Sequence, residues 1–248
     1  TAVQCSNHPP WRIPRHLTCF LNSVEGGKNN HFGLKIEIKL ELNFSIIIMS
    51  DLRLAKPSDA EGILKIYAPY IESTSFTFET ETPSVEAFAE RINTYLIHWP
   101  WLVCEVDGKI AGYAYATRHR ERTAYQWSVE SSIYLDDNFQ RTGIARALYT
   151  ALFEILKIQG FRNVYAVINL PNDKSVAFHE SLGFIYFATY EKVGYKLGNW
   201  KDVGWWKLSI NDYGDEPAAP LKLADLNNNF LTDIFAKRVL LIKNKYMR

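Results

Sequence analysis

The order of apolar and polar residues changes period several times along the chain, and each change predicts a new element. From 127 to 135 the sequence WSVESSIYL is rich in β-branched and aromatic residues, which predicts a strand. The following residues, 136–138, favour a turn. From 142 to 160 apolar residues recur at steps of three and four, the spacing of a helix: Ile144, Leu148, Ala151, Leu152, Ile155 and Leu156.

The neighbouring segments extend this pattern. Pro57-Ser58-Asp59 begins a helix that ends near Ile71, and Pro83-Ser84 begins a second one. Asp107-Gly108 predicts a hairpin turn. A short helix over 172–182 is closed by Gly183. The remaining strands are predicted over 51–55, 101–106, 109–117, 164–168, 184–192 and 203–210. This order of strands and helices predicts an α/β fold, a mixed sheet flanked by helices.

The two ends of the chain differ from residues 49–212, which we expect to form one domain. Residues 34–44 alternate strictly between apolar and charged positions, as in a half-buried strand. Met49 is the first methionine, and we interpret it as the natural start, with 1–48 as upstream sequence; the alternative is a genuine extra edge strand. Residues 213–248 are predicted to be a linker and a helix over 228–243 that packs on its own domain or on a partner.

The composition of the chain limits which kinds of binding partner we expect. The apolar content of 47% and the charged content of 22% are ordinary for globular proteins. The net charge of +1 implies no broad field for nucleic acid or membrane. Cys5, Cys19 and Cys104 have neither disulfide nor metal-ligand spacing, so we expect no metal and a cytoplasmic protein.

Two features indicate chemistry. The segment QRTGIA, residues 140–145, joins the turn to the helix, and the unpaired N–H groups of a helix start favour an anion. The alternative is that Gly143 only marks the helix start. Glu130 lies in the middle of a strand that is otherwise apolar or hydroxyl-bearing, where a carboxylate is costly unless it is paired or useful. Its alternative is a solvent-facing strand residue.

These segments resemble a known family. QRTGIA fits Q/R-x-x-G-x-G/A, the pyrophosphate loop of the GNAT superfamily of acyl-CoA N-acyltransferases. Together with WSVESSIYL, LPNDKSVAFHESLGF and GNWKDVGWW, it resembles the phosphinothricin N-acetyltransferases over about residues 49–210. The resemblance implies the GNAT fold and transfer of acetyl from acetyl-CoA to the α-amine of a small amino-acid analogue of the phosphinothricin, methionine sulfone or methionine sulfoximine type.

The resemblance also implies roles for particular residues. Glu130 is the expected base. His179 stands where the superfamily commonly has tyrosine, as a proton donor or a contact near the thioester; a lone histidine on a short helix is otherwise structural. Asn172 matches a cofactor contact, and helix capping is the alternative. The cofactor-binding residues are expected to be Ile133, Tyr134 and Leu135 for pantetheine, and Arg141, Thr142, Gly143, Ile144, Ala145 and Arg146 for pyrophosphate.

Substrate selection is expected from a loop and an aromatic wall. Arg120 and Arg122 correspond to basic residues that face the acidic group of the substrate, and the alternative is a solvated charge run. Arginine suits a carboxylate because its fork donates two parallel hydrogen bonds. Phe78, Tyr125 and Trp127 are expected to form the wall, although core packing is the alternative for Trp127. The subfamily has a proline-containing segment where this chain has Thr117-Arg118-His119, which leaves the exact substrate open.

The same residues leave two alternative functions open and bear on whether the protein is a homodimer. A protein N-terminal or lysine acetyltransferase would use the same fold, and so would a non-catalytic acyl-CoA sensor. We expect direct transfer, because no cysteine falls at the thioester position. The resemblance implies a homodimer, with an apolar surface of Trp200, Trp205 and Trp206 at the contact; the alternative is that the tail helix covers these tryptophans.

Overall fold

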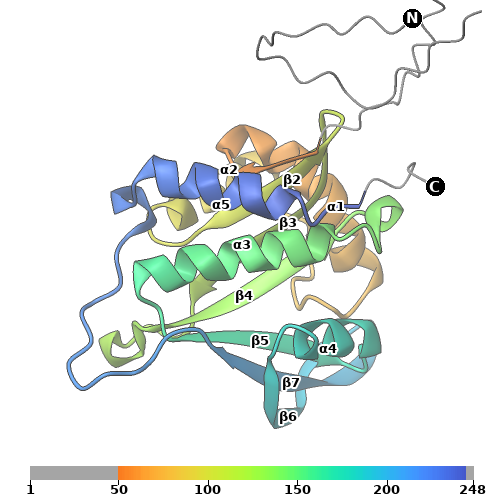
Figure 1. Ribbon diagram of the computed structural model, residues 1–248. Helices are drawn as coiled ribbons and strands as arrows, with labels where there is room; N and C mark the ends of the chain where they lie inside the picture. Colours follow the sequence, from red (N-terminus) through yellow and green to blue (C-terminus); the bar gives the residue numbers. More distant parts are fainter. Residues whose placement is uncertain (1–49, 244–248) are drawn as a thin grey trace, which may run out of the picture. The chain divides into compact units, whose positions relative to one another are not determined.

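A computed structural model describes residues 50–243, so that the predicted strand over 34–44 and Met49 lie outside the described residues. The described chain forms one seven-stranded sheet in the order β1-β2-β3-β4-β5-β7-β6 (Figure 1). Neighbouring strands are antiparallel except for the parallel pair β4 and β5. The strands are β1 (Ser50–Leu54), β2 (Trp101–Val106), β3 (Lys109–Arg118), β4 (Ser128–Leu135), β5 (Asn163–Leu170), β6 (Ile185–Lys196) and β7 (Asn199–Ser209). The predicted mixed sheet with flanking helices is confirmed.

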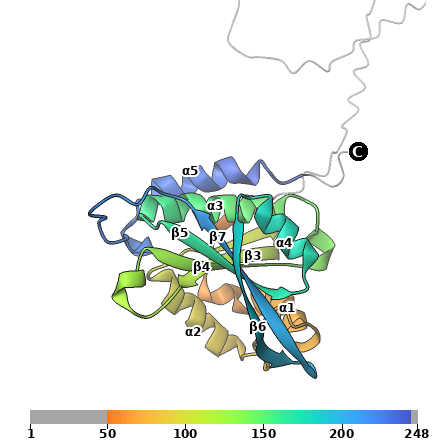
Figure 2. The ribbon, with the colours of Figure 1, turned by 90° about the horizontal axis from the view of Figure 1, so that it is seen from below.

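Helices cover both faces of the sheet (Figure 2). α1 and α2 pack on one face in a core that includes Trp101 and Val103, whereas α3 and α5 pack on the other with Leu102 and Cys104. The alternation along β2 therefore divides its side chains between two separate cores. The helices are α1 (Ala60–Ser73), α2 (Val85–Leu96), α3 (Ile144–Gln159), α4 (Asp173–Glu180) and α5 (Asn228–Val239), with short 3-10 turns at Pro57–Asp59, Thr123–Tyr125, Asp137–Phe139 and Leu223–Asp225.

The sheet opens between its two parallel strands. β4 and β5 pair only over residues 128–131 and 163–166. Beyond that point β4 continues along β3 to Leu135, and β5 continues along β7 to Leu170. The strands thus separate, and residues 132–135 keep one backbone edge that faces the opening rather than a neighbouring strand.

Glycines occupy the turn of the first hairpin and both ends of α3. The hairpin between β2 and β3 turns at Asp107 and Gly108, whose φ angles of 49° and 77° are those of a two-residue hairpin turn. α3 begins after Gly143 with φ 89° and ends before Gly160 with φ 94°. Both positions require the left-handed region, which glycine adopts without steric cost.

The β6–β7 hairpin is longer than the sequence pattern predicts. β6 continues to Lys196 and β7 begins at Asn199, with Leu197 and Gly198 at positive φ in the turn. The register shifts between Tyr190 and Gly194, so the outer half of the hairpin follows a break in the pairing. Glycines and an irregular register hide the alternation that marks a strand.

The predicted tryptophan surface is wrong for two of its three members. Trp205 and Trp206 are only 6% and 4% exposed, because adjacent positions of β7 enter the two sides of the sheet. Trp200 is 62% exposed. Other large apolar side chains are exposed along β6 and in the turn that follows it: Ile185, Tyr186, Phe187, Tyr190, Val193, Tyr195 and Leu197.

The tail helix lies elsewhere. α5 packs on α3 and β1, and it buries Leu231 and Ile234. Its Arg238 forms an ion pair with Glu154 of α3 at 2.6 Å. The helix ends at Val239, four residues earlier than predicted, and it covers α3 rather than the tryptophans of β7.

Candidate active site

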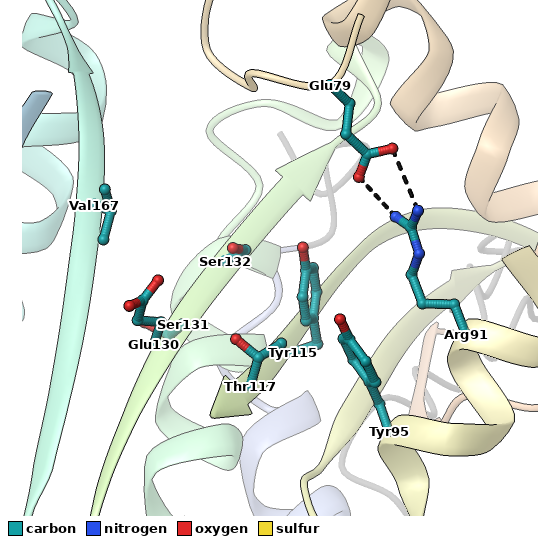
Figure 3. A pocket seen from close by; sticks show the side chains of 9 residues that line it. All are labelled: Glu79, Arg91, Tyr95, Tyr115, Thr117, Glu130, Ser131, Ser132 and Val167. Atoms are coloured by element: carbon teal, nitrogen blue, oxygen red, sulfur yellow. Dashed lines mark hydrogen bonds and ion pairs between the residues drawn. The ribbon is translucent and has the colours of Figure 1, made fainter. Parts of the chain in front are cut away.

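A cavity of about 350 Å³ lies on the α1 and α2 side of the sheet, where β4 and β5 separate. β3 and β4 form its floor, α2 and the loop before it form one wall, and β5 lies opposite (Figure 3). The residues that line it are mostly polar: Glu79, Arg91, Tyr95, Tyr115, Thr117, Glu130, Ser131, Ser132 and Val167. A small polar molecule fits a cavity of this size.

Glu130 lies at the floor of this cavity. It pairs with Thr117 of β3 and with Tyr165 of β5, on the opposite sheet face from the fully buried Val129. Its Oε1 atom accepts a hydrogen bond from His119 Nδ1 at 2.9 Å and lies 3.5 Å from the guanidinium of Arg120. With 28% of its side chain exposed, Glu130 is a paired carboxylate at the cavity rather than a solvated strand residue.

A second carboxylate lines the facing wall. Glu79 forms an ion pair with Arg91 at 2.7 Å, and the hydroxyl of Tyr67 donates to the same carboxylate at 3.2 Å. Figure 3 shows this pair pointing toward the cavity from the loop and from α2. The two carboxylates therefore differ in their closest partner: Glu79 has the guanidinium of Arg91 at 2.7 Å, whereas Glu130 has the imidazole of His119 at 2.9 Å and the guanidinium of Arg120 only at 3.5 Å.

The predicted substrate residues do not form one wall. Arg120 lies beside Glu130 and 5.4 Å over the ring of Trp205. Arg122 instead lines a second hollow of about 220 Å³, together with Arg118 and Lys222. Arg120 contacts both regions.

The predicted aromatic residues are also dispersed. The Phe78 ring lies against Gly194 of β6, where a Cβ atom would be 2.3 Å from it. The Tyr125 ring is 5.9 Å from that of His119. Trp127 donates its Nε1 hydrogen to the carbonyl of Ala218 at 2.8 Å. Only Tyr125 touches the Glu130 network, and none of the three lines the cavity.

The predicted pyrophosphate loop has the backbone that an anion site needs. Arg141 has φ 62° and Gly143 has φ 89°, and the Thr142 hydroxyl donates to the carbonyl of Phe139 at 2.6 Å. The amides of 144–146 donate to no acceptor among the described residues, whereas that of Ala147 begins the helical series. Free amides at a helix start favour bound phosphate. The side chain of Arg146 donates to Ser181 at 3.1 Å, while that of Arg141 is exposed.

The chain's tail borders this loop. The amide of Lys243 donates to the carbonyl of Thr142 at 2.7 Å, and a Cβ atom on Gly143 would lie 2.3 Å from the carbonyl oxygen of Leu241. Gly143 is thus required both by its φ angle and by the close approach of another backbone segment. The sequence does not predict this contact, because 98 residues separate Gly143 from Leu241.

The predicted pantetheine strand is only partly free. Residues 132–135 face the opening between β4 and β5, but the carbonyl of Leu135 accepts a hydrogen bond from Tyr70 at 2.9 Å. The Tyr134 side chain packs between Tyr67 and Tyr70, with ring centroids 4.8 and 5.1 Å away, so its backbone rather than its ring faces the opening. Ile133 packs against the core on the α3 side. Asn172 caps α4 by accepting from the amide of Ser175 at 3.2 Å, which is its capping role.

His179 lies in the packed side of the molecule. It is 4% exposed, its Nδ1 hydrogen is donated to the carbonyl of Ser175 at 2.8 Å, and its Nε2 accepts from the hydroxyl of Tyr149 at 3.2 Å. Burial lowers the pKa of His179, and the hydrogen bond to the Ser175 carbonyl opposes this shift only in part. The net lowering of the pKa favours the neutral ring. His179 does not line the cavity.

Several residues that line the cavity, and His119 next to them, carry no sequence signal of their own. Glu79 and Arg91 lie in a polar loop and on the polar side of a helix, where charge is expected in any case. Tyr115, Thr117 and His119 alternate along β3 and just beyond it, and Ser132 follows Glu130 on the same face. Strand alternation would place them together only once the register of β3 against β4 is known.

Comparison with known proteins agrees with this geometry. Residues 52–205 match the acetyltransferase (GNAT) domain family. The chain is 41% identical to a phosphinothricin N-acetyltransferase of Streptomyces viridochromogenes over 170 residues, which cover 68% of this chain and 91% of that protein. It is 30% identical to an L-methionine sulfoximine/L-methionine sulfone acetyltransferase of Salmonella typhimurium, covering 68% of this chain and 97% of that protein.

A solved structure supports the same grouping. The fold is similar to the crystal structure of a phosphinothricin acetyltransferase from Sinorhizobium meliloti in complex with AcCoA, with a TM-score of 0.65 and 32% identity over 68% of this chain and 93% of that one. The order of strands, the opening between β4 and β5 and the free amides before α3 fit this relationship. The chain therefore belongs to the GNAT family and is an acetyl-CoA-dependent N-acetyltransferase.

Proposed function

We propose that this enzyme acetylates the α-amine of a small amino-acid analogue of the phosphinothricin, methionine sulfone or methionine sulfoximine type. The observation that carries the proposal is Glu130, a half-buried carboxylate at the floor of a cavity of about 350 Å³. The cavity suits a compact substrate, and the relatives at 41% and 30% identity are named for substrates of this class. Arg120 next to Glu130 supplies a cation for an acidic group of the substrate.

In this proposal Glu130 is the general base. The free amine attacks the carbonyl carbon of the thioester that acetyl-CoA supplies, the new C–N bond forms, and the amine proton moves to Glu130. The C–S bond breaks, CoA leaves as its thiolate, and the thiolate takes a proton from solvent to become the free thiol. The amides of 144–146 hold the phosphates, and the open edge of β4 at 132–134 accompanies the pantetheine arm. We assign His179 a supporting contact through Tyr149, because its ring is buried and does not line the cavity.

Transfer is proposed to be direct, without an acyl-enzyme. Cys104 is the one cysteine among the described residues. It is fully buried on the α3 side of the sheet, away from Glu130. Burial raises the pKa of its thiol to about 12, so its nucleophilic thiolate form is rare at neutral pH.

A substrate panel tests this function. The enzyme is incubated with acetyl-CoA and with phosphinothricin, methionine sulfone, methionine sulfoximine, a peptide with a free N-terminus or a lysine peptide, and released thiol is measured. We expect release with at least one of the three small analogues and a much lower kcat/KM with the peptides. Preference for either peptide indicates a protein acetyltransferase, and acetyl-CoA binding without release in any arm indicates a sensor; both outcomes contradict the proposal.

We also propose that two copies pair through the β6–β7 hairpin. β6 is an edge strand, and the outer end of its hairpin exposes the large apolar side chains Tyr195 and Trp200, whose ring centroids lie 5.4 Å apart. Edge strands and apolar patches of this kind are usually covered, and two-fold pairing is the commonest closed symmetry.

Light scattering tests the pairing. The wild-type chain is expected to have the mass of a dimer, and Trp200→Glu combined with Tyr195→Glu is expected to lower it to that of a monomer. Leu240→Glu, at another exposed apolar position, is the matched control and should not change the mass. A wild-type monomer contradicts the proposal.

A further inference from the structure

We propose that His119 is a positioning residue for Glu130: its Nδ1 hydrogen holds one carboxylate oxygen and thereby directs the other into the cavity. This inference rests on the proposed role of Glu130 as the base. The observation behind it is the 2.9 Å contact between His119 Nδ1 and Glu130 Oε1. An ionised carboxylate only accepts hydrogen bonds, so the imidazole nitrogen must carry the hydrogen when Glu130 is ready to take a proton.

The imidazole ring is itself held on three sides. It stacks on Tyr165, with centroids 4.4 Å apart and planes at 20°, and the rings of Trp205 and Tyr125 meet it edge to face at 5.9 Å. Its side chain is only 12% exposed. Aromatic contacts of this geometry restrict a ring's orientation. His119 is therefore fixed before any substrate binds.

The imidazole and the guanidinium near Glu130 approach the same oxygen. Arg120 also approaches Oε1, at 3.5 Å, whereas Oε2 has no hydrogen-bond partner among the described residues. One oxygen is anchored and the other remains available. A base that is already oriented loses less entropy in the transition state than one whose carboxylate rotates freely.

His119 lies where this sequence differs from the subfamily that it resembles. It belongs to Thr117-Arg118-His119, the segment where the sequence departs from the proline-containing segment of the subfamily that it resembles. The same segment ends β3, and the pairing of Thr117 with Glu130 brings His119 to the carboxylate. The departure in sequence and the contact with Glu130 thus coincide.

Two substitutions separate positioning from packing. His119→Asn retains an N–H donor near the Nδ1 position but loses the ring, whereas His119→Phe retains the ring stack on Tyr165 but loses the donor. We expect His119→Phe to lower kcat by about tenfold to a hundredfold, with little change in KM for acetyl-CoA or in Tm. His119→Asn should retain kcat within about threefold. The opposite order, with Asn impaired and Phe active, overturns the proposal in favour of packing.

A double-mutant cycle tests the connection to Glu130. In a Glu130→Gln background, His119→Phe should have little further effect on kcat, because residues that act through one another are not additive. A full, additive loss in that background overturns the positioning role. His98→Phe is the matched control and should leave kcat unchanged, because this histidine meets the ring of Trp99 at a tilt of 45° and forms no hydrogen bond with Glu130.

The outcomes for the two proposals differ. If Glu130→Gln retains wild-type turnover with the best analogue of the substrate panel, the base assignment fails, and the positioning role fails with it. If Glu130→Gln is inactive but His119→Phe is as active as the wild type, the base assignment stands and only the positioning role is overturned.

Discussion

His119 and His179 lie in two regions of the molecule that differ in what surrounds the imidazole ring. His119 lies at the edge of the cavity, with one nitrogen on Glu130 and aromatic faces around it. His179 lies in the core beside α3, with one nitrogen on the carbonyl of Ser175 and the other on the hydroxyl of Tyr149. The first therefore bonds a carboxylate that faces the cavity, whereas the second bonds a backbone carbonyl and a buried tyrosine hydroxyl.

This difference shows why a residue's type does not set its use. In the core, every polar atom of the histidine must be satisfied internally, because an unpaired buried group costs about 1–3 kcal/mol. Near the cavity, one carboxylate oxygen can remain without a protein partner because water or substrate can reach it. Near the cavity, Glu130 thus keeps one oxygen available, whereas both ring nitrogens of His179 are taken by neighbouring groups.

The largest expected effect is at the carboxylate of the open region. Glu130→Gln should lower kcat by about two to four orders of magnitude, the range for a general base, with little change in KM for acetyl-CoA. Glu79→Gln is the matched control, since Glu79 lines the same cavity but is paired with Arg91. Steady-state kinetics with the best analogue measure both. Equal losses in the two variants would mean that the cavity needs charge rather than a base at Glu130.

The next effect is at the loop that begins α3. Gly143→Ala should raise KM for acetyl-CoA and lower Tm, because an alanine at φ 89° costs about 1–2 kcal/mol and its Cβ would meet the carbonyl of Leu241. Gly108→Ala is the control: it has φ 77° and no neighbour within 4 Å, so it bears only the backbone cost. Thermal unfolding with and without acetyl-CoA compares them. The same loss of Tm in both would contradict a role for the tail contact.

A comparison of Arg120 with Arg122 tests where the acidic group of the substrate binds. Arg120→Ala should raise the substrate KM by about tenfold, the order of one charge-assisted hydrogen bond, because Arg120 lies beside Glu130. Arg122→Ala should have a smaller effect, since Arg122 lines the second hollow. KM is measured for substrate and for acetyl-CoA. An effect of Arg122→Ala that exceeds that of Arg120→Ala would relocate the acidic group of the substrate to that hollow.

The smallest effect is a pH dependence of the packed region. Because the folded pKa of His179 is lowered, the unfolded chain binds this proton more readily, so the histidine's stabilisation is complete above the unfolded pKa of about 6.5 and declines below it. The slope is at most about 1.4 kcal/mol per pH unit. The loss of unfolding free energy in His179→Gln should therefore shrink as pH falls from 7 to 5.5.

A neighbouring variant controls for acid denaturation in general. Phe184→Leu removes volume next to the same ring without removing a titrating group, and its cost in unfolding free energy should be constant over this range. Urea unfolding at several pH values measures both. A His179→Gln cost that does not change with pH would mean that the native protein accommodates the charged ring.

Much of the fold follows from the sequence. The periodicity of residues 142–160 predicts α3, and Asp107-Gly108 predicts the first hairpin, because both signals are local: a helix repeats every three to four residues, and a two-residue turn needs its own φ angles. The family segments together predict the GNAT fold and an acetyltransferase, which the comparisons confirm. The β6–β7 hairpin is longer than the sequence predicts, because glycines and a shift in the pairing register interrupt the alternation that marks a strand.

Only the tertiary structure brings the site together. Glu130 can be chosen from the sequence because a carboxylate is unusual in such a strand, but its partner His119 depends on the register of β3 against β4. The buried surroundings of His179, the separation of Arg120 from Arg122 and the approach of Leu241 to Gly143 depend on packing between distant segments. Sequence determined the elements and the chemistry available in them, because those are set within a few residues. The tertiary structure decided which groups meet and which oxygen remains free, because contacts between strands and helices depend on register and on burial.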